Sequence, residues 1–201
     1  MNDKDTIINK FEKAGIVTVI VVMIMRIWLG PATNTSLLVF TTLLSTYYLW
    51  FSFFIFNKLA PMQMLNRVIV QGLYPYQVYI TILMGVVLSF ALIAILAGFM
   101  FFPLMPLIMF WAFLALTGFT AYLAIYHIIK KRELPFLRRY FYRAALYIGL
   151  LGLLLIPPVE TRLKILYRDH PDFIEAYMEY LENPEDKEAR ERLSDVRSRF
   201  R

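Results

Sequence analysis

The chain contains no cysteine among its 201 residues. This absence excludes disulfide bonds, thiolate metal ligands and cysteine nucleophiles. It also means that cysteine usage does not indicate whether the protein lies in an oxidising or a reducing compartment. Histidine is nearly absent too, because His127 and His170 are the only two. The acids around His170 stand at the start of an expected helix, where negative charge is favourable without a metal. We therefore predict neither a metal site nor a cofactor.

Acidic residues are missing from the entire stretch between Glu12 and Glu133. Proton- and cation-coupled transporters usually keep a carboxylate inside the membrane, and carboxylate acid–base catalysis needs one as well. Because we expect the first membrane-crossing segment to begin at Ala14, no crossing segment is expected to carry such a group. The sequence thus disfavours both of these function classes.

Long apolar runs dominate what is present. The chain is 59% hydrophobic, with a mean hydropathy of +0.57. Residues 37–56 and 78–102 carry no charge, and residues 104–129 carry a charge only when His127 is protonated. About 20 apolar residues are enough for a helix to cross a bilayer. The chain is therefore predicted to be an all-α, polytopic helical membrane protein with about five transmembrane segments, at 14–29, 37–56, 78–102, 104–129 and 144–159.

Composition divides the chain into three parts. Residues 1–13 read as a charged N-terminal leader, and their acids, together with Arg26 in the next segment, argue against a signal peptide. Residues 14–158 form the predicted transmembrane bundle, which includes an interfacial segment at 57–77 and a basic loop at 130–143. Residues 159–201 form a soluble tail with an amphipathic helical hairpin. The fifth segment is short, so it either crosses fully or re-enters.

The formal net charge of +6 lies mostly beside the expected spans. Such a distribution is typical of topology signals and not of a nucleic-acid interface. The positive-inside rule places the leader, the interfacial segment and the basic loop in the cytoplasm. The C-terminus lies outside if the fifth segment crosses. Since we find no retention or transit signal, a bacterial inner membrane is the expected location.

The basic loop is the strongest of these topology signals. A cytoplasmic basic cluster beside a span attracts anionic lipid headgroups, at about 1 kcal/mol per residue near the surface. We expect this contact from six side chains: Lys130, Lys131, Arg132, Arg138, Arg139 and Arg143.

Two polar residues stand inside or at the end of a span. Arg26 can extend to the outer interface, or it can pair with a lipid phosphate, a quinone oxygen or a carboxylate of another subunit. His127 can contact headgroups at the inner end of the fourth segment. A Ser–His pair is conceivable, but the spans offer no acid to orient it. The serines available within the spans are Ser45, Ser52 and Ser89.

The tail carries two amphipathic patterns of helical period. The first runs from Asp172 to Leu181 and the second from Glu185 to about Phe200. A short tail buries little core by itself, so we expect its apolar faces to dock on a partner. The predicted docking residues are Phe173, Tyr177, Tyr180, Leu193 and Phe200.

These patterns favour a non-enzymatic integral membrane subunit or accessory protein, whose spans pack against other membrane proteins. Gly149 and Gly152 add a weak signal for close helix packing, since they are three residues apart and not four. One alternative is a small transporter or channel for an apolar or anionic solute. A second alternative is a lipid-active enzyme that uses His127.

Overall fold

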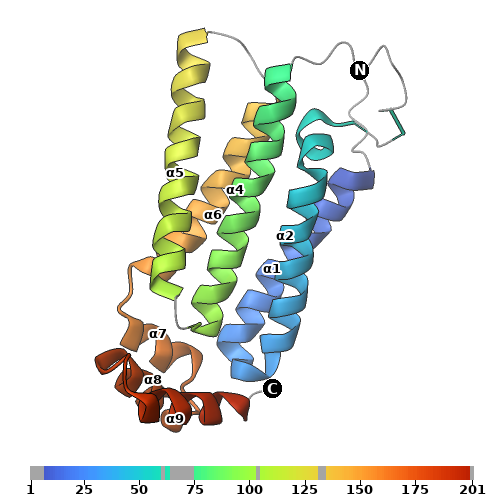
Figure 1. Cartoon of the computed structure of the whole chain (residues 1–201). Helices are drawn as coiled ribbons and strands as arrows, with labels where there is room; N and C mark the ends of the chain where they lie inside the picture. The colour runs from blue at the N-terminus through green and yellow to red at the C-terminus, as the bar shows by residue number, and fades with distance from the viewer. Residues whose placement is uncertain (1–6, 60–61, 64–74, 103–104, 131–134, 200–201) are drawn as a thin grey trace.

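The computed structural model describes residues 7–59, 62–63, 75–102, 105–130 and 135–199, and these residues form helices and short connections with no strand (Figure 1). The predicted all-α fold is confirmed. The long helices are α1 (Ile7–Leu29), α2 (Asn34–Asn57), α4 (Pro75–Met100), α5 (Met105–Lys130) and α6 (Pro135–Leu155). Short helices follow at α7 (Val159–Leu166), α8 (Pro171–Glu182) and α9 (Lys187–Ser198).

Among the described residues, three continuous helical stretches are long and apolar enough to cross a membrane: Ile7–Asn57, Pro75–Met100 and Met105–Ile129. The bent pair α6 and α7 makes a fourth if it counts as one span. The first stretch doubles back at a short 3-10 helix, η1 (Gly30–Thr33), so α1 and α2 lie side by side and antiparallel (Figure 1). At 1.5 Å per residue the five long helices measure roughly 31–39 Å, enough for a hydrocarbon core of about 30 Å.

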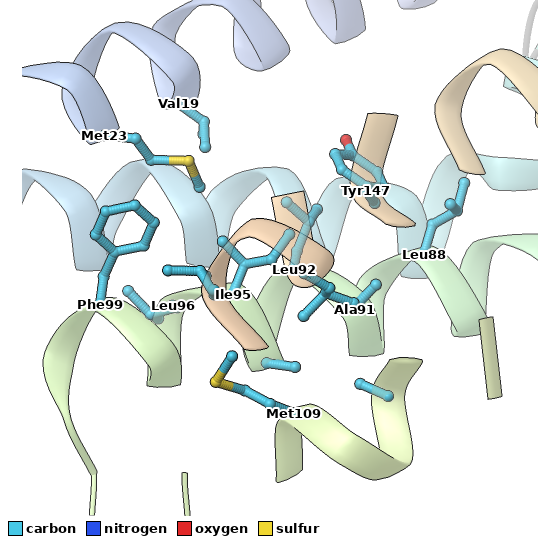
Figure 2. Close-up of a cluster of buried hydrophobic side chains, with 14 of the residues drawn as sticks. Val19, Met23, Leu88, Ala91, Leu92, Ile95, Leu96, Phe99, Met109 and Tyr147 are labelled. Atoms are coloured by element: carbon cyan, nitrogen blue, oxygen red, sulfur yellow. The ribbon is translucent and has the colours of Figure 1, made fainter. Parts of the chain in front are cut away.

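Two backbone features bring the first helices together. Gly30 has a φ of +64°, the left-handed conformation that glycine adopts most easily, and it reverses the chain between α1 and α2. Gly85 lets α4 approach α2 closely, because a Cβ there would lie 2.2 Å from the Cβ of Ser52. Helix α4 is accordingly the central helix of the bundle. Leu88, Ala91, Leu92 and Ile95 lie along its buried length (Figure 2).

Two segment boundaries differ from the sequence-based expectation. Helix α1 begins at Ile7, so residues 7–13 belong to the bundle and not to a separate leader. Helix α6 begins at Pro135, so Arg138, Arg139 and Arg143 are helical residues and not part of a loop. In both places the expected span included only the apolar part of the helix, and the structure shows that the helix continues through the adjacent polar residues. Most of the predicted interfacial segment at 57–77 lies outside the described residues.

Helix α6 runs along the bundle from the end where α1 begins to the opposite end (Figure 1). The chain then bends by 99° between α6 and α7, at Pro157 and Pro158. Helices α7, α8 and α9 lie across that end of the bundle (Figure 1). The tail therefore sits at the end opposite the first turn of α1, where a crossing fifth segment would place it.

Candidate functional site

A buried acid lies in the first helix. Glu12 is fully buried, and both of its carboxylate oxygens are engaged by the guanidinium of Arg143 on α6. Nε of Arg143 donates to Oε1 and Nη2 donates to Oε2, so the pair is bidentate. This is the strong, directional form of an arginine–carboxylate pair. It joins two helices that are far apart in the sequence.

Two tyrosines extend this pair into a chain of hydrogen bonds. The Tyr48 hydroxyl on α2 donates to Oε1 of Glu12 at 2.7 Å. The Tyr147 hydroxyl on α6 donates to the Tyr48 oxygen at 3.2 Å, and the two rings meet edge to face. We call Glu12, Arg143, Tyr48 and Tyr147 the polar cluster. Its members come from α1, α2 and α6, so it holds these three helices in one arrangement.

The guanidinium of Arg143 has further contacts. Its Nη1 donates to the backbone oxygen of Arg139 at 2.7 Å, and its Cζ lies 5.4 Å from the centre of the Phe56 ring. Few donors or acceptors in the cluster are left for a substrate. The geometry therefore resembles a structural ion pair more than an open catalytic site, because a buried charge is tolerated when it is paired and hydrogen-bonded.

The expectation that no crossing segment carries a carboxylate is wrong. It placed the start of the first segment at Ala14, two residues beyond Glu12. One sequence signal would have found the site. Asn9, Glu12, Val19 and Arg26 fall on a single buried stripe of α1, so the helical period continues past the apolar run in both directions.

The six basic residues of the predicted loop do not share one role. Arg143 is half-buried and its guanidinium binds Glu12 in the polar cluster, and its headgroup contact stays a prediction. Nη1 of Arg139 donates to the backbone oxygen of Phe56 at 2.6 Å, which ties α6 to the end of α2. Arg138 is exposed beside Tyr142, and its headgroup contact stays a prediction. The side chain of Lys130 and all of Lys131 and Arg132 lie outside the described residues.

Arg26 lies against the tail of its own chain. Its side chain is fully buried, and Nη1 donates to the backbone oxygen of Leu166 on α7 at 2.8 Å. Its Cζ lies 4.6 Å from the ring centre of Tyr167. Arg26 therefore faces the tail of its own chain, because α7 covers this end of α1.

No hydrogen bond joins His127 to Ser45, Ser52 or Ser89 in the described part of the chain. Oγ of Ser45 lies 2.7 Å from Oγ of Ser89, so these two hydroxyls join α2 to α4. Ser52 packs against Gly85 at the closest approach of the same two helices. His127 is half-buried, and its Nδ1 has no hydrogen-bond partner among the described residues. No histidine and acid cluster fit for a metal occurs within the described ranges either.

The tail residues predicted to dock on a partner are largely occupied within the chain. Phe173, Tyr177 and Leu193 are buried. The Tyr177 ring meets Phe101, at the end of α4, with centroids 5.4 Å apart, and burial raises the pKa of its phenol to about 12. Tyr180 is half-buried, and Phe200 lies outside the described residues. The tail is thus seated on its own bundle, since its apolar stripe covers the end of α4.

One face of α6 is left open to the surroundings. Ala145 and Gly149 are exposed, and Gly152 is half-exposed. A Cβ placed on Gly149 or Gly152 would meet nothing within 4 Å. Ala145 and Gly149 are four residues apart, which is the small-xxx-small spacing of close helix pairs in membranes. We call Ala145, Gly149 and Gly152 the small-residue face.

The chain matches no protein-family model, no curated protein and no solved structure.

Proposed function

We propose that this chain is a non-enzymatic accessory subunit of a membrane complex, and that it packs against a helix of its partner through the small-residue face of α6. The observation that carries the proposal is the exposed pair Ala145 and Gly149, four residues apart, with open space at Gly149. A glycine in a helix costs about 1 kcal/mol relative to alanine, so an exposed, unused glycine has no benefit within this chain. Against another helix it permits close backbone approach.

The other exposed surfaces of the bundle are consistent with a lipid-facing exterior. Bulky apolar side chains cover them, as at Trp111 on α5 and Trp50 on α2. Lipid tails are as apolar as these side chains, so bulky apolar surface alone does not drive helix association. Small residues that let two backbones approach do favour it, and on α6 the exposed Ala145 and Gly149 have the four-residue spacing that close helix pairs use.

The polar cluster agrees better with a scaffold than with a transporter. A proton carrier must release and rebind its proton during the cycle. Glu12 is instead held by Arg143 and Tyr48 at once, so the carboxylate is committed to structure. This arrangement favours a rigid bundle over a cycling one.

The proposal also includes an orientation in the membrane. Lys10, Lys13 and Arg138 lie at the end of the bundle where α1 and α6 begin. By the positive-inside rule this end faces the cytoplasm, and the tail then lies outside. A bacterial inner membrane remains the proposed location.

The test compares two glycine substitutions of the full chain. Gly149→Leu fills the small-residue face, whereas Gly118→Leu on α5 adds the same side chain at a site that is also open. We expect the wild type and Gly118→Leu to carry the same stoichiometric membrane partner after mild detergent extraction, and Gly149→Leu to lose it. The partner would be identified by mass spectrometry of the purified complex.

Two outcomes would contradict the proposal. One is a wild-type chain that is extracted from native membranes without detergent and purifies as a single monodisperse species with no partner protein. The other is equal partner recovery from Gly149→Leu and Gly118→Leu. Equal thermal unfolding of both variants is the control, because a lost partner must not reflect a lost fold.

A further inference from the structure

A lateral cavity lies between α1, α6 and α7 at the tail end of the bundle. Its volume is about 260 Å³, larger than the roughly 150 Å³ cavity that can hold benzene. The walls are apolar and include Met23 and Ile27 of α1, Leu150 and Leu154 of α6, and Phe99 of α4. Met23 and Phe99 also appear in the adjoining core (Figure 2). The one charged side chain in this lining is Arg162 of α7.

The rim of this cavity opens sideways, toward the position of lipid. Ile24 is 51% exposed and Leu153 is 68% exposed, and both line the cavity. Trp28, at the end of α1, is 70% exposed. An exposed tryptophan at the end of a span is typical of the headgroup level. An acyl chain of the bilayer can therefore enter from the side with its headgroup near α7.

Arg162 is a buried cation with poor partners. Its residue exposure is 7%, and Nε has no hydrogen-bond partner among the described residues. Nη1 lies 3.3 Å from the sulfur of Met105 and 3.7 Å from that of Met109, which are weak acceptors. The Phe101 ring centre lies 5.7 Å from its Cζ. Aromatic and thioether contacts do not neutralise a guanidinium, so this charge lacks a counter-ion among the residues that the structure describes.

Arg26 adds a second cation at the same end. Its Nη1 donates to Leu166, a residue that also lines the cavity. Nε and Nη2 of Arg26 are buried, and besides the Leu166 oxygen the guanidinium contacts the Tyr167 side chain. No acidic side chain pairs with either arginine within the described residues. An uncompensated buried charge is costly, so the site is complementary to an anion.

We propose that this cavity binds one acyl chain of an anionic phospholipid from the surrounding bilayer, whose phosphate pairs with Arg162. The apolar walls take the chain. The Arg162 guanidinium, once it turns from the Met105 and Met109 sulfurs toward the cavity, offers the planar donor pair that fits a phosphate. Arg26 contributes positive potential from behind Leu166. This lipid would fill a groove that the protein itself leaves empty and would fasten α7 to α1 and α6. The inference is independent of the partner helix proposed for the small-residue face.

The test measures lipid retention by the full chain. The protein is placed in nanodiscs of phosphatidylglycerol or phosphatidylcholine with identical acyl chains, and native mass spectrometry reports the bound lipid. We expect one phosphatidylglycerol to be retained, with an affinity about tenfold or more above that for phosphatidylcholine. Both lipids carry a phosphate, but the choline cation of phosphatidylcholine cancels its charge and is repelled by the two buried arginines.

Three variants make the test specific. Arg162→Met removes the charge and should abolish the preference for phosphatidylglycerol. Ile24→Trp keeps both buried arginines but fills the rim of the cavity, so it should weaken retention of either lipid. Arg168→Met removes an exposed arginine at the same end and should change nothing. If Arg162→Met fails to fold, the Ile24→Trp variant still decides the result.

Equal retention of the two lipids by the wild type would overturn the proposal. Unchanged phosphatidylglycerol binding in Ile24→Trp would also overturn it, since the cavity would then not be the site. Tighter binding of free oleate than of phosphatidylglycerol would assign the cavity to a free fatty acid instead.

Discussion

Breaking the buried pair of Glu12 and Arg143 should destabilise the bundle more than any surface change. In Arg143→Met the arginine is replaced by an apolar side chain of similar length, and the carboxylate of Glu12 remains fully buried. Removing one partner of a buried pair costs about 3–5 kcal/mol. The side chain of Arg143 is only 16% exposed, so solvent offers little compensation.

The second half of this prediction is a double substitution. Replacing both residues, as Glu12→Leu with Arg143→Met, removes the unpaired charge as well as the pair. Buried pairs replaced by apolar residues of similar volume are often neutral in stability. We therefore expect the double variant to recover much of the loss, with a coupling energy of about 2–3 kcal/mol.

The assay is reversible unfolding in mixed micelles, followed by far-ultraviolet circular dichroism. Lys164→Met is the matched control, because Lys164 pairs with Glu160 at the surface. The Lys164 side chain is 64% exposed and the Glu160 side chain is 53% exposed. Exposed pairs contribute little, so the unfolding midpoint of this control should barely move. An unfolding midpoint of Arg143→Met equal to that of Lys164→Met would refute the buried pair. If the stability losses of Glu12→Leu and Arg143→Met alone add up to the loss in the double variant, the coupling is refuted.

Two further predictions concern packing and orientation. Gly85→Ala should destabilise the bundle by about 1–3 kcal/mol, since the added Cβ would overlap Ser52, whereas Gly118→Ala should not destabilise it. Thermal unfolding in detergent compares the two variants. Equal melting temperatures would contradict the close approach of α2 and α4. In this cysteine-free chain, an impermeant maleimide on intact cells should label Glu185→Cys but not Lys10→Cys; labelling of Lys10→Cys alone would reverse the proposed orientation.

The helical class and the main helices could be predicted from the sequence because they depend on local chemistry. Uncharged apolar runs long enough to cross a bilayer have few alternatives to helix, since their backbone groups must be satisfied within the segment. The tail helices followed from the spacing of Phe173 and Tyr177 on one face and from Pro171 in the first turn of α8. The boundaries at Ile7 and Pro135 were missed because polar residues extend α1 and α6 beyond their apolar parts.

The functional features could not be predicted in the same way, because their partners are distant in the sequence. Glu12 meets Arg143 across 131 positions, and Arg26 meets Leu166 across 140. Hydrophobic period places a residue on the buried face of a helix, but it does not say which residue of another helix lies opposite.

By itself, the sequence determined that this chain forms apolar helices suited to a membrane, with a helical tail, because length, hydropathy and capping are properties of adjacent residues. Only the tertiary structure decided what the few polar groups do. It paired Glu12 with Arg143, left Arg162 beside an apolar cavity and exposed Gly149 on α6. These outcomes depend on how whole helices pack, and packing brings together residues that no local pattern connects.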